Sequence, residues 1–170
     1  MTTAAGRRPM NPLQKALERF AASRLGGWWF INVAMPIDRR LLPLTRGRVS
    51  SALGQPVGLL ETVGAKSGEK RQTPLLFLGR GGDVVLVASK AGAPRHPAWY
   101  HNLRAHPRVR FLAPHRTGEY VARVAEGEER ARLWAEVNHL YAGYEVYSDR
   151  AGGREIPVVV LERAPGATTP

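Results

Sequence analysis

The sequence contains no cysteine among its 170 residues. This absence excludes a disulfide scaffold, a cysteine-based zinc or iron–sulfur site and a cysteine nucleophile. A long apolar run is also missing: the longest spans residues 26–37, whereas a membrane-spanning helix needs about 20 residues. Arg7-Arg8 is not followed by an apolar stretch with a small-residue cleavage site. We therefore predict a cytoplasmic protein without an export signal.

Acidic residues and lysines are scarce. The chain has 14 Asp and Glu against 25 Lys and Arg, a net charge of +11, and only four of the 25 are lysines. Residues 1–60 hold nine basic and two acidic residues (+7), residues 61–120 hold ten and four (+6), and residues 121–170 hold six and eight (−2). Such a surface attracts nucleic acid, an anionic membrane face or a small polyanion.

The order of the predicted elements favours an α+β fold. The length suits one domain, and the hydrophobic content of 44% suits a globular core. Apolar runs predict six strands, at 57–63, 73–78, 84–88, 109–112, 120–124 and 156–161, with a hairpin connection at 79–83. Helices are predicted at 13–25, 37–44, 97–105 and 126–140. Consecutive strands favour an antiparallel sheet or small barrel, and their weak alternation suggests burial on both faces in a dimer.

The loop after the first predicted strand has an anion-binding pattern. It reads Gly64-Ala65-Lys66-Ser67-Gly68-Glu69-Lys70-Arg71. Its glycines allow a tight backbone with exposed N–H groups, and Lys66, Ser67 and Arg71 add a charge, a hydroxyl and a planar fork. It is not a Walker A loop, because the glycine–lysine order differs and a strand follows. A solvated hairpin turn with ordinary surface charges is the alternative.

A second segment joins a strand end to a helix. Ala88-Ser89-Lys90 leads through a Gly/Pro loop into Pro97-Ala98-Trp99-Tyr100-His101-Asn102. A helix N-terminus attracts anions, small residues let a planar ligand approach, and the aromatic rings offer flat surfaces. A junction packed by its aromatic rings is the alternative. His96, His101 and His106 are five apart, not the three or four that place ligands on one helical face, so we predict no metal site.

These segments together resemble the deazaflavin-dependent nitroreductase and quinone reductase family. The resemblance is carried by residues 64–68 with Arg71 and Thr73-Pro74-Leu75, by residues 88–90 and above all by residues 93–103, and it extends to 38–42 and 154–161. It implies a split β-barrel related to flavin-binding pyridoxamine-phosphate oxidases. It also implies coenzyme F-420, a deazaflavin with a phosphate and an oligoglutamate tail, and hydride transfer to quinones, nitroaromatics or other unsaturated acceptors.

The resemblance implies a division of the chain and a coenzyme site. Residues 1–48 would form an N-terminal helical or interfacial segment, 49–164 the coenzyme-binding barrel and 165–170 a tail. Lys70 and Arg95 are outer candidates for the coenzyme tail, and Ala65 stands where many relatives carry arginine, so one tail contact is expected to be missing. The implied cofactor-binding residues are Ala65, Lys66, Ser67, Arg71, Gln72, Thr73, Pro74, Leu75, Leu76, Val87, Ala88, Ser89, Lys90, Ala98, Trp99, Tyr100, His101 and Asn102.

Three tyrosines suggest where an acceptor binds. Tyr141, Tyr144 and Tyr147 lie three apart, on one face if the last long helix continues through them. We hypothesise that they wall the acceptor pocket, and that Tyr144 or else Ser89 donates a proton to the reduced acceptor, with Tyr141 as a further catalytic candidate. Packing in the core or a dimer is the alternative, and Gly143 argues against an unbroken helix.

Other functions and partners stay open. FMN is the nearest rival cofactor, because related split barrels use it. A coenzyme carrier without turnover is a second rival. A non-catalytic nucleic-acid binder is a third, but no nucleic-acid-binding signature accompanies the basic residues, so we expect no such partner. Trp28, Trp29 and nearby arginines suggest peripheral membrane contact through residues 24–40. Packing of these aromatic rings onto the domain or a second subunit is the alternative. A homodimer is expected from the family alone.

Overall fold

The computed structural model describes residues 33, 35–45 and 55–164. The predicted helix 13–25, Trp28, Trp29 and the tail 165–170 lie outside these residues. The strands are β1 (Val57–Val63), β2 (Lys70–Leu76), β3 (Leu78–Arg80), β4 (Asp83–Val87), β5 (Arg108–Leu112), β6 (Gly118–Val124) and β7 (Val158–Arg163). The helices are α3 (Met35–Leu44), the short 3-10 turn η2 (Lys90–Gly92), α4 (Ala98–Ala105), α5 (Gly127–Leu140) and α6 (Gly143–Arg150). Within the described ranges, no helix combines the length and apolar character needed to cross a bilayer.

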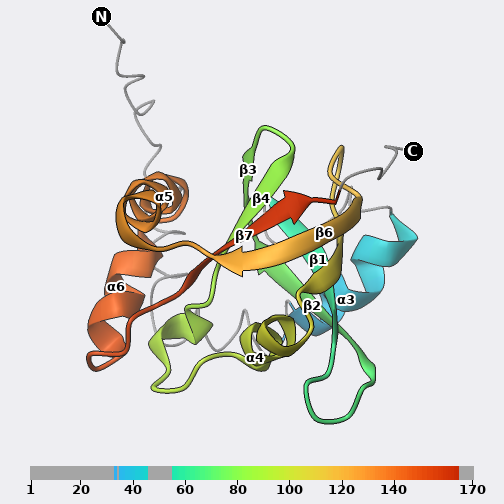
Figure 1. Ribbon diagram of the computed structural model, residues 1–170, viewed down its shortest axis with the longest axis horizontal. Coiled ribbons are helices and arrows are strands. Elements are labelled where there is room, and N and C mark those ends of the chain that lie inside the picture. Colours follow the sequence, from blue (N-terminus) through green and yellow to red (C-terminus); the bar gives the residue numbers. More distant parts are fainter. Residues whose placement is uncertain (1–32, 34, 46–54, 165–170) are drawn as a thin grey trace, which may run out of the picture.

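The strands form one curled antiparallel sheet in the order β2-β1-β5-β6-β7-β4-β3. β2 and β3 occupy its opposite edges, although only Phe77 separates them in the chain. The sheet must therefore curl until its edges meet at Phe77, whose N–H donates to the Pro56 carbonyl at 3.0 Å. Figure 1 shows the resulting barrel with α4 at one end and α5 and α6 along its side. The predicted α+β fold with antiparallel strands is confirmed.

The bend at Phe77 corrects one predicted strand. The strand expected at 73–78 is β2, which begins earlier, at Lys70, and is followed by the separate strand β3. Pro74 lies inside β2 and is tolerated there because an edge strand has one side without ladder partners. The expected hairpin is present between β3 and β4, with Gly81 in a left-handed conformation (φ 56°) at its turn. Strand β1 has the predicted bounds.

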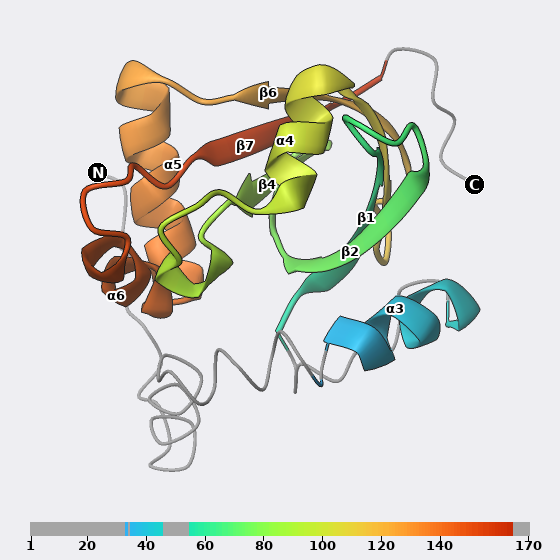
Figure 2. The same cartoon turned by 90° about the horizontal axis from the view of Figure 1, so that it is seen from below.

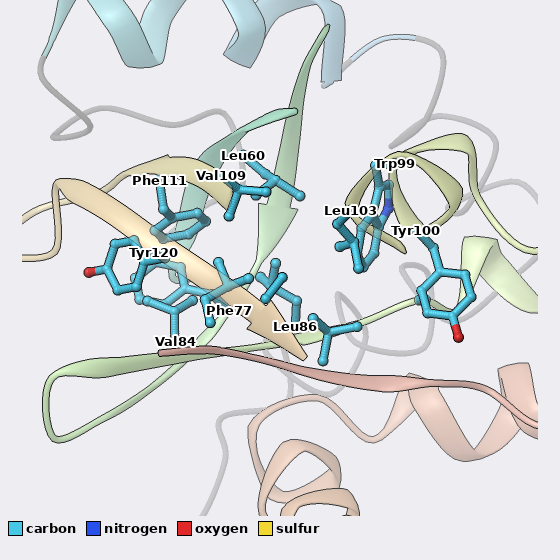
Figure 3. Packing of buried hydrophobic residues seen from close by; sticks show 14 of the residues in the cluster. Leu60, Phe77, Val84, Leu86, Trp99, Tyr100, Leu103, Val109, Phe111 and Tyr120 are labelled. Atoms are coloured by element: carbon cyan, nitrogen blue, oxygen red, sulfur yellow. The ribbon is translucent and has the colours of Figure 1, made fainter. Parts of the chain in front are cut away.

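Two clusters of buried side chains share β4 and β7. The barrel interior holds Val84, Leu86, Val159 and Leu161 together with Phe77, Phe111 and Tyr120, and α4 adds Trp99 and Leu103 (Figure 3). The other face of the same two strands contributes Val85, Val87, Val158 and Val160 to a cluster with residues of α5 and α6. Both faces of β4 and β7 are thus buried within one chain. In β4 and β7, the weak alternation that suggested a dimer has its physical cause in α5 and α6.

Three helices begin at other residues than predicted; α3 begins at Met35 and not at residue 37. Pro97 and Glu126 precede α4 and α5 as N-cap residues with extended backbones, not as first helical residues. α5 ends at Leu140, and a separate helix, α6, begins at Gly143. A Cβ at Gly143 would overlap the ring of Tyr141, so the tyrosine packs where only glycine leaves room. At the other end of the described chain, α3 buries Leu42 against Val57 and Leu59.

Gly58 is the tightest glycine position in the barrel wall. A Cβ built there would overlap the ring of Phe111, which is fully buried and packs edge-on against Phe77. We expect Gly58→Ala to lower the free energy of unfolding by about 1–3 kcal/mol, the usual cost of overpacking a core. Urea unfolding measures this loss. The control is Gly82→Ala, whose Cβ would meet nothing within 4 Å. Equal losses in the two variants would contradict the packing argument.

Candidate functional site

The β1–β2 loop, residues 64–69, is a tight hydrogen-bonded turn. The Gly64 N–H donates to the Glu69 carbonyl at 2.8 Å, and the Gly68 N–H donates to the Gly64 carbonyl at 2.9 Å. Gly68 is left-handed (φ 68°), the conformation for which glycine is preferred. Residues 65–71 are all exposed. The loop therefore holds Lys66 in solvent on a fixed backbone, while Ser67 Oγ accepts the Glu69 N–H at 3.3 Å.

Asn102 joins this loop to α4. Its Oδ1 accepts the Ala65 N–H at 3.0 Å, and its Nδ2 donates to Thr62 Oγ1 at 3.1 Å. Asn102 and Thr62 are buried, so these bonds are shielded from competing water. The N-terminus of α4 follows directly from the second predicted segment. Asn102 thereby brings the two segments together, and Figures 1 and 2 show both loops at the α4 end of the barrel.

The second segment, the β4–α4 loop at residues 88–97, has an unusual backbone. Lys90, Ala91 and Gly92 lie in the left-handed region, with φ of 49°, 53° and 78°. Gly92 also packs against α6, since a Cβ there would stand 2.6 Å from the Arg150 Cβ and 2.8 Å from the Tyr147 carbonyl oxygen. No side chain other than hydrogen fits at this position without a shift of α6. The loop is therefore shaped by its contact with α6.

Arg154 is a residue that sequence reasoning missed. From the segment before β7, its guanidinium donates to the carbonyls of Ser89 at 2.8 Å and Ala93 at 3.0 Å. Its Nη1 lies 2.9 Å from Nδ1 of His96. The only sequence signal for Arg154 was its place at the start of the resembling stretch 154–161. Contacts between residues this far apart leave no local pattern in a single sequence.

The predicted site residues fall into three groups by exposure. Exposed residues are Ala65, Lys66, Ser67, Arg71, Lys90, Ala98 and His101. Half-buried residues are Gln72, Thr73, Leu75 and Leu76. Buried residues are Pro74, Val87, Ala88, Ser89, Trp99, Tyr100, Asn102, Tyr141 and Tyr144. The charged and hydroxyl-bearing residues of the β1–β2 loop thus face solvent, whereas the residues of the strand end and α4 mostly support them.

Two expectations about this site need revision. Trp99 and Tyr100, expected to offer flat open surfaces, are 5% and 8% exposed and belong to the barrel core. They are buried because α4 closes the open end of the barrel with this face. Arg71, whose guanidinium was expected to bind an anion, forms an ion pair with Glu69. Both partners of that pair are mostly exposed, so the pair contributes little to stability and separates easily.

The three tyrosines do meet, although not on one helix. Tyr141 is the C-cap of α5, and only Tyr144 and Tyr147 belong to α6. Their ring centroids lie 5.3 to 6.4 Å apart, and the hydroxyls of Tyr141 and Tyr147 are 3.0 Å from each other. Burial raises the pKa of Tyr144 and of Tyr147. Ala91 packs against the same cluster, so the tyrosines lie beside the β4–α4 loop.

A cavity of about 320 Å³ opens at a different place, between the end of α4 and β6. Its lining consists of Leu103, Arg104, Pro107, Ala122, Arg123, Val124 and Glu126. None of these is a predicted site residue. The cavity therefore does not coincide with the two predicted loops.

Comparisons with known proteins identify a family and a fold. A family model described as F420H(2)-dependent quinone reductase matches residues 39–163. An F420H(2)-dependent quinone reductase of Mycobacterium tuberculosis strain H37Rv is 42% identical over 124 residues, 70% of this chain and 83% of that protein. A solved domain-swapped dimer is 33% identical with a TM-score of 0.60, covering 74% of this chain and 96% of the other. The structure of an F420-H2 dependent reductase is 39% identical with a TM-score of 0.55, covering 63% and 94%. The expected split barrel is confirmed.

The contact between His96 and Arg154 makes stability depend on pH. A guanidinium only donates, so Nδ1 of His96 accepts and the ring is neutral. Burial lowers the pKa of His96, and the charges of Arg154 and His101 lower it further. The unfolded chain then binds the proton more readily than the folded chain. The stabilisation by His96 is therefore complete above about pH 6.5 and is lost as the pH falls from there toward the lowered pKa.

Melting temperatures between about pH 7.5 and pH 5 test this expectation. His96→Asn keeps an acceptor for Arg154 but binds no proton, so we expect the acid-side fall in melting temperature to become shallower. His115→Asn is the control, because His115 is exposed and its left-handed backbone (φ 59°) suits asparagine. A slope that His96→Asn leaves unchanged would show that His96 does not titrate in this way.

Proposed function

The chain belongs to the F420H(2)-dependent quinone reductase family of oxidoreductases, and we propose that it binds coenzyme F-420 at the α4 end of the barrel and transfers a hydride to a quinone. The observation that carries this proposal is that Asn102 joins the β1–β2 loop to α4. Both lie inside the matched range 39–163. Nitroaromatics and other unsaturated compounds are further proposed acceptors.

The chemistry of the two loops fits a coenzyme with a phosphate and several carboxylates. In the part of the chain that the structure describes, Lys66, Lys70 and Lys90 are exposed and form no ion pair. Cations of this kind bind anionic groups without first losing a partner. The Ser67 hydroxyl and the Arg71 guanidinium add donors beside them. Ala65 contributes its N–H to Asn102 and adds no charge to the loop.

The small residues of the β4–α4 loop fit the ring system of such a coenzyme. Ala98 is exposed and small, so a flat ligand can approach the start of α4 closely, whereas Ala88 and Ser89 are buried behind the loop. When bound, the reduced deazaflavin supplies the hydride. Residues of the chain bind its anionic groups, orient its ring at the end of β4 and, through the buried aromatic face of α4, keep water out of the barrel below.

Reduction of a quinone by a hydride also requires a proton at a carbonyl oxygen, so that a hydroquinone results. Tyr144 is the proposed donor, and Ser89 the second candidate. The raised pKa of Tyr144 keeps its phenol protonated at neutral pH. A weak acid of this kind donates a hydrogen bond to the developing oxyanion before the proton moves. Tyr141 would assist Tyr144 indirectly: its hydroxyl contacts that of Tyr147, and this contact holds the neighbouring rings in place.

Contacts with a membrane and with a second copy stay predictions. Of the expected interfacial segment, the described part is α3, on which Ile37 and Leu44 are 44% and 82% exposed beside the exposed Arg39 and Arg40. An apolar and basic surface of this kind suits the headgroup zone of an anionic bilayer, where a lipid-soluble quinone is found. A homodimer is proposed because one similar structure is a domain-swapped dimer.

Substitutions in the β1–β2 loop test the coenzyme site. Titration of the purified protein with oxidised F-420, followed by coenzyme fluorescence, measures affinity, with FMN titrated in parallel. We expect Lys66→Ala and Arg71→Ala each to raise the Kd for F-420 about tenfold, a loss of about 1.4 kcal/mol per charged contact. Arg132→Ala removes an exposed arginine of α5 and serves as the control for net charge. Binding of FMN alone, or of neither compound, would contradict the proposed cofactor.

Turnover with menaquinone tests the proton donors. We expect Tyr144→Phe to lower kcat about a hundredfold, as loss of a general acid does, and Ser89→Ala to have the smaller effect. Tyr120→Phe is the matched control: it removes another buried tyrosine hydroxyl, one that donates to the Arg116 carbonyl at 2.9 Å in the barrel core. If Tyr144→Phe and Ser89→Ala both keep wild-type turnover, neither residue donates the proton.

A further inference from the structure

One side chain binds several residues of the β4–α4 loop. Besides its bonds to the carbonyls of Ser89 and Ala93, Arg154 reaches the Ala88 carbonyl with Nη1 at 3.4 Å. The same Nη1 faces His96. The guanidinium therefore contacts four of the ten residues of the loop, at its start, its middle and its end. These contacts join positions that are 58 to 66 residues apart in the chain.

The loop needs such a clamp because its backbone is strained. Lys90 and Ala91 adopt left-handed conformations that are unfavourable for residues with a Cβ. Residues in such conformations keep them only where the surrounding structure holds them. Two hydrogen bonds within the loop stabilise the same turn. The Gly92 N–H donates to the Ser89 carbonyl, and the Ala93 N–H donates to the Lys90 carbonyl. Arg154 binds two residues of this turn, Ser89 and Ala93, from outside.

The charge of Arg154 is directed at the loop and not at a carboxylate. Its neighbour Glu155 pairs instead with Arg130 of α5, at 2.7 Å between Oε1 and Nε. Arg130 also donates to the Ile156 carbonyl at 3.2 Å. Two half-buried arginines thus flank one short segment, and only Arg154 touches the loop. Arg130 is therefore a matched comparison for Arg154.

We propose that Arg154 is the positioning residue of the coenzyme site, holding residues 88–93 in the left-handed turn that receives F-420. This inference rests on the proposed function of the same site. Arg154 acts through the loop carbonyls, and contact with the coenzyme is made by the loop and the start of α4. Without the clamp the loop samples other conformations, and the apparent Kd rises in proportion to the lost population of the competent one.

The first test needs no coenzyme. Amide hydrogen exchange of the ligand-free protein is compared among the wild type, Arg154→Ala, Arg154→Lys and Arg130→Ala. We expect Arg154→Ala to accelerate exchange about tenfold at Gly92 and Ala93, whose N–H groups are hydrogen-bonded within the turn. Arg130→Ala should leave these two amides unchanged. The change in melting temperature of Arg130→Ala measures how much stability is lost when a half-buried arginine beside this segment is removed.

The second test titrates the same proteins with oxidised F-420. We expect the Kd to rise about tenfold in Arg154→Ala, if the competent loop falls to about one tenth of the population, and not in Arg130→Ala. Arg154→Lys keeps the positive charge but loses the planar guanidinium with its several donors. Its Kd for F-420 should therefore lie between those of Arg154→Ala and Arg130→Ala. At saturating coenzyme, the kcat of Arg154→Ala should stay near that of the wild type. The substitution lowers the population of the competent loop conformation, and bound coenzyme restores that population.

The outcomes separate this inference from the proposed function. A wild-type protein that does not bind F-420 overturns the proposed function and the positioning role with it. A wild type that binds, together with Arg154→Ala that binds equally well or exchanges no faster at Gly92 and Ala93, overturns the positioning role alone. If Arg154→Ala does not fold, Arg154→Lys decides: wild-type affinity and exchange in that variant would overturn the proposal.

Discussion

The single residue between β2 and β3 constrains the whole barrel. These strands form the two edges of a seven-stranded sheet in the described chain, so a linker of one residue is possible only if the edges meet. Phe77 makes that corner with its backbone hydrogen-bonded to Pro56 and its ring 5.3 Å from that of Phe111. The interior is then filled by side chains from most strands, and one end remains to be closed. Trp99 and Leu103 of α4 close it, which is why α4 and the loops on either side of it share that end.

Closing the barrel positions α4, but polar contacts position the loops. Loops on a surface lose much conformational entropy when they are held in one shape, and few apolar contacts compensate for that loss. Here two buried or half-buried polar side chains do so, Asn102 for the β1–β2 loop and Arg154 for the β4–α4 loop. Each satisfies backbone groups that lie near solvent, and each comes from a segment fixed by the core. Both loops of the candidate site are therefore held in one shape before any ligand is present.

Patterns within one element were readable from the sequence, whereas contacts between elements were not. The apolar run of β1 and the long periodic helix α5 gave correct bounds within a residue. Phe77 carries no glycine or proline signal, so the corner that divides β2 from β3 was missed. The spacing of Tyr141, Tyr144 and Tyr147 correctly suggested that they meet, but they do so across a helix break. Arg154 had no local signal because its partners lie far away in the chain.

The distribution of charge favours a compact polyanion over nucleic acid as the ligand. Most ion pairs among the described residues lie on the β5, β6 and α5 side, where Arg123 contacts both Glu129 and Glu162 at 2.6 Å and Arg110 lies near Glu61 and Glu119. The acidic residues thus neutralise that surface. At the α4 end Lys66, Lys70, Lys90 and Arg95 are exposed and form no ion pair within the described part of the chain. These four cations lie in or beside two short loops, whereas a nucleic-acid backbone requires cations along an extended stripe. A coenzyme with a phosphate and several carboxylates on one flexible tail matches the smaller arrangement.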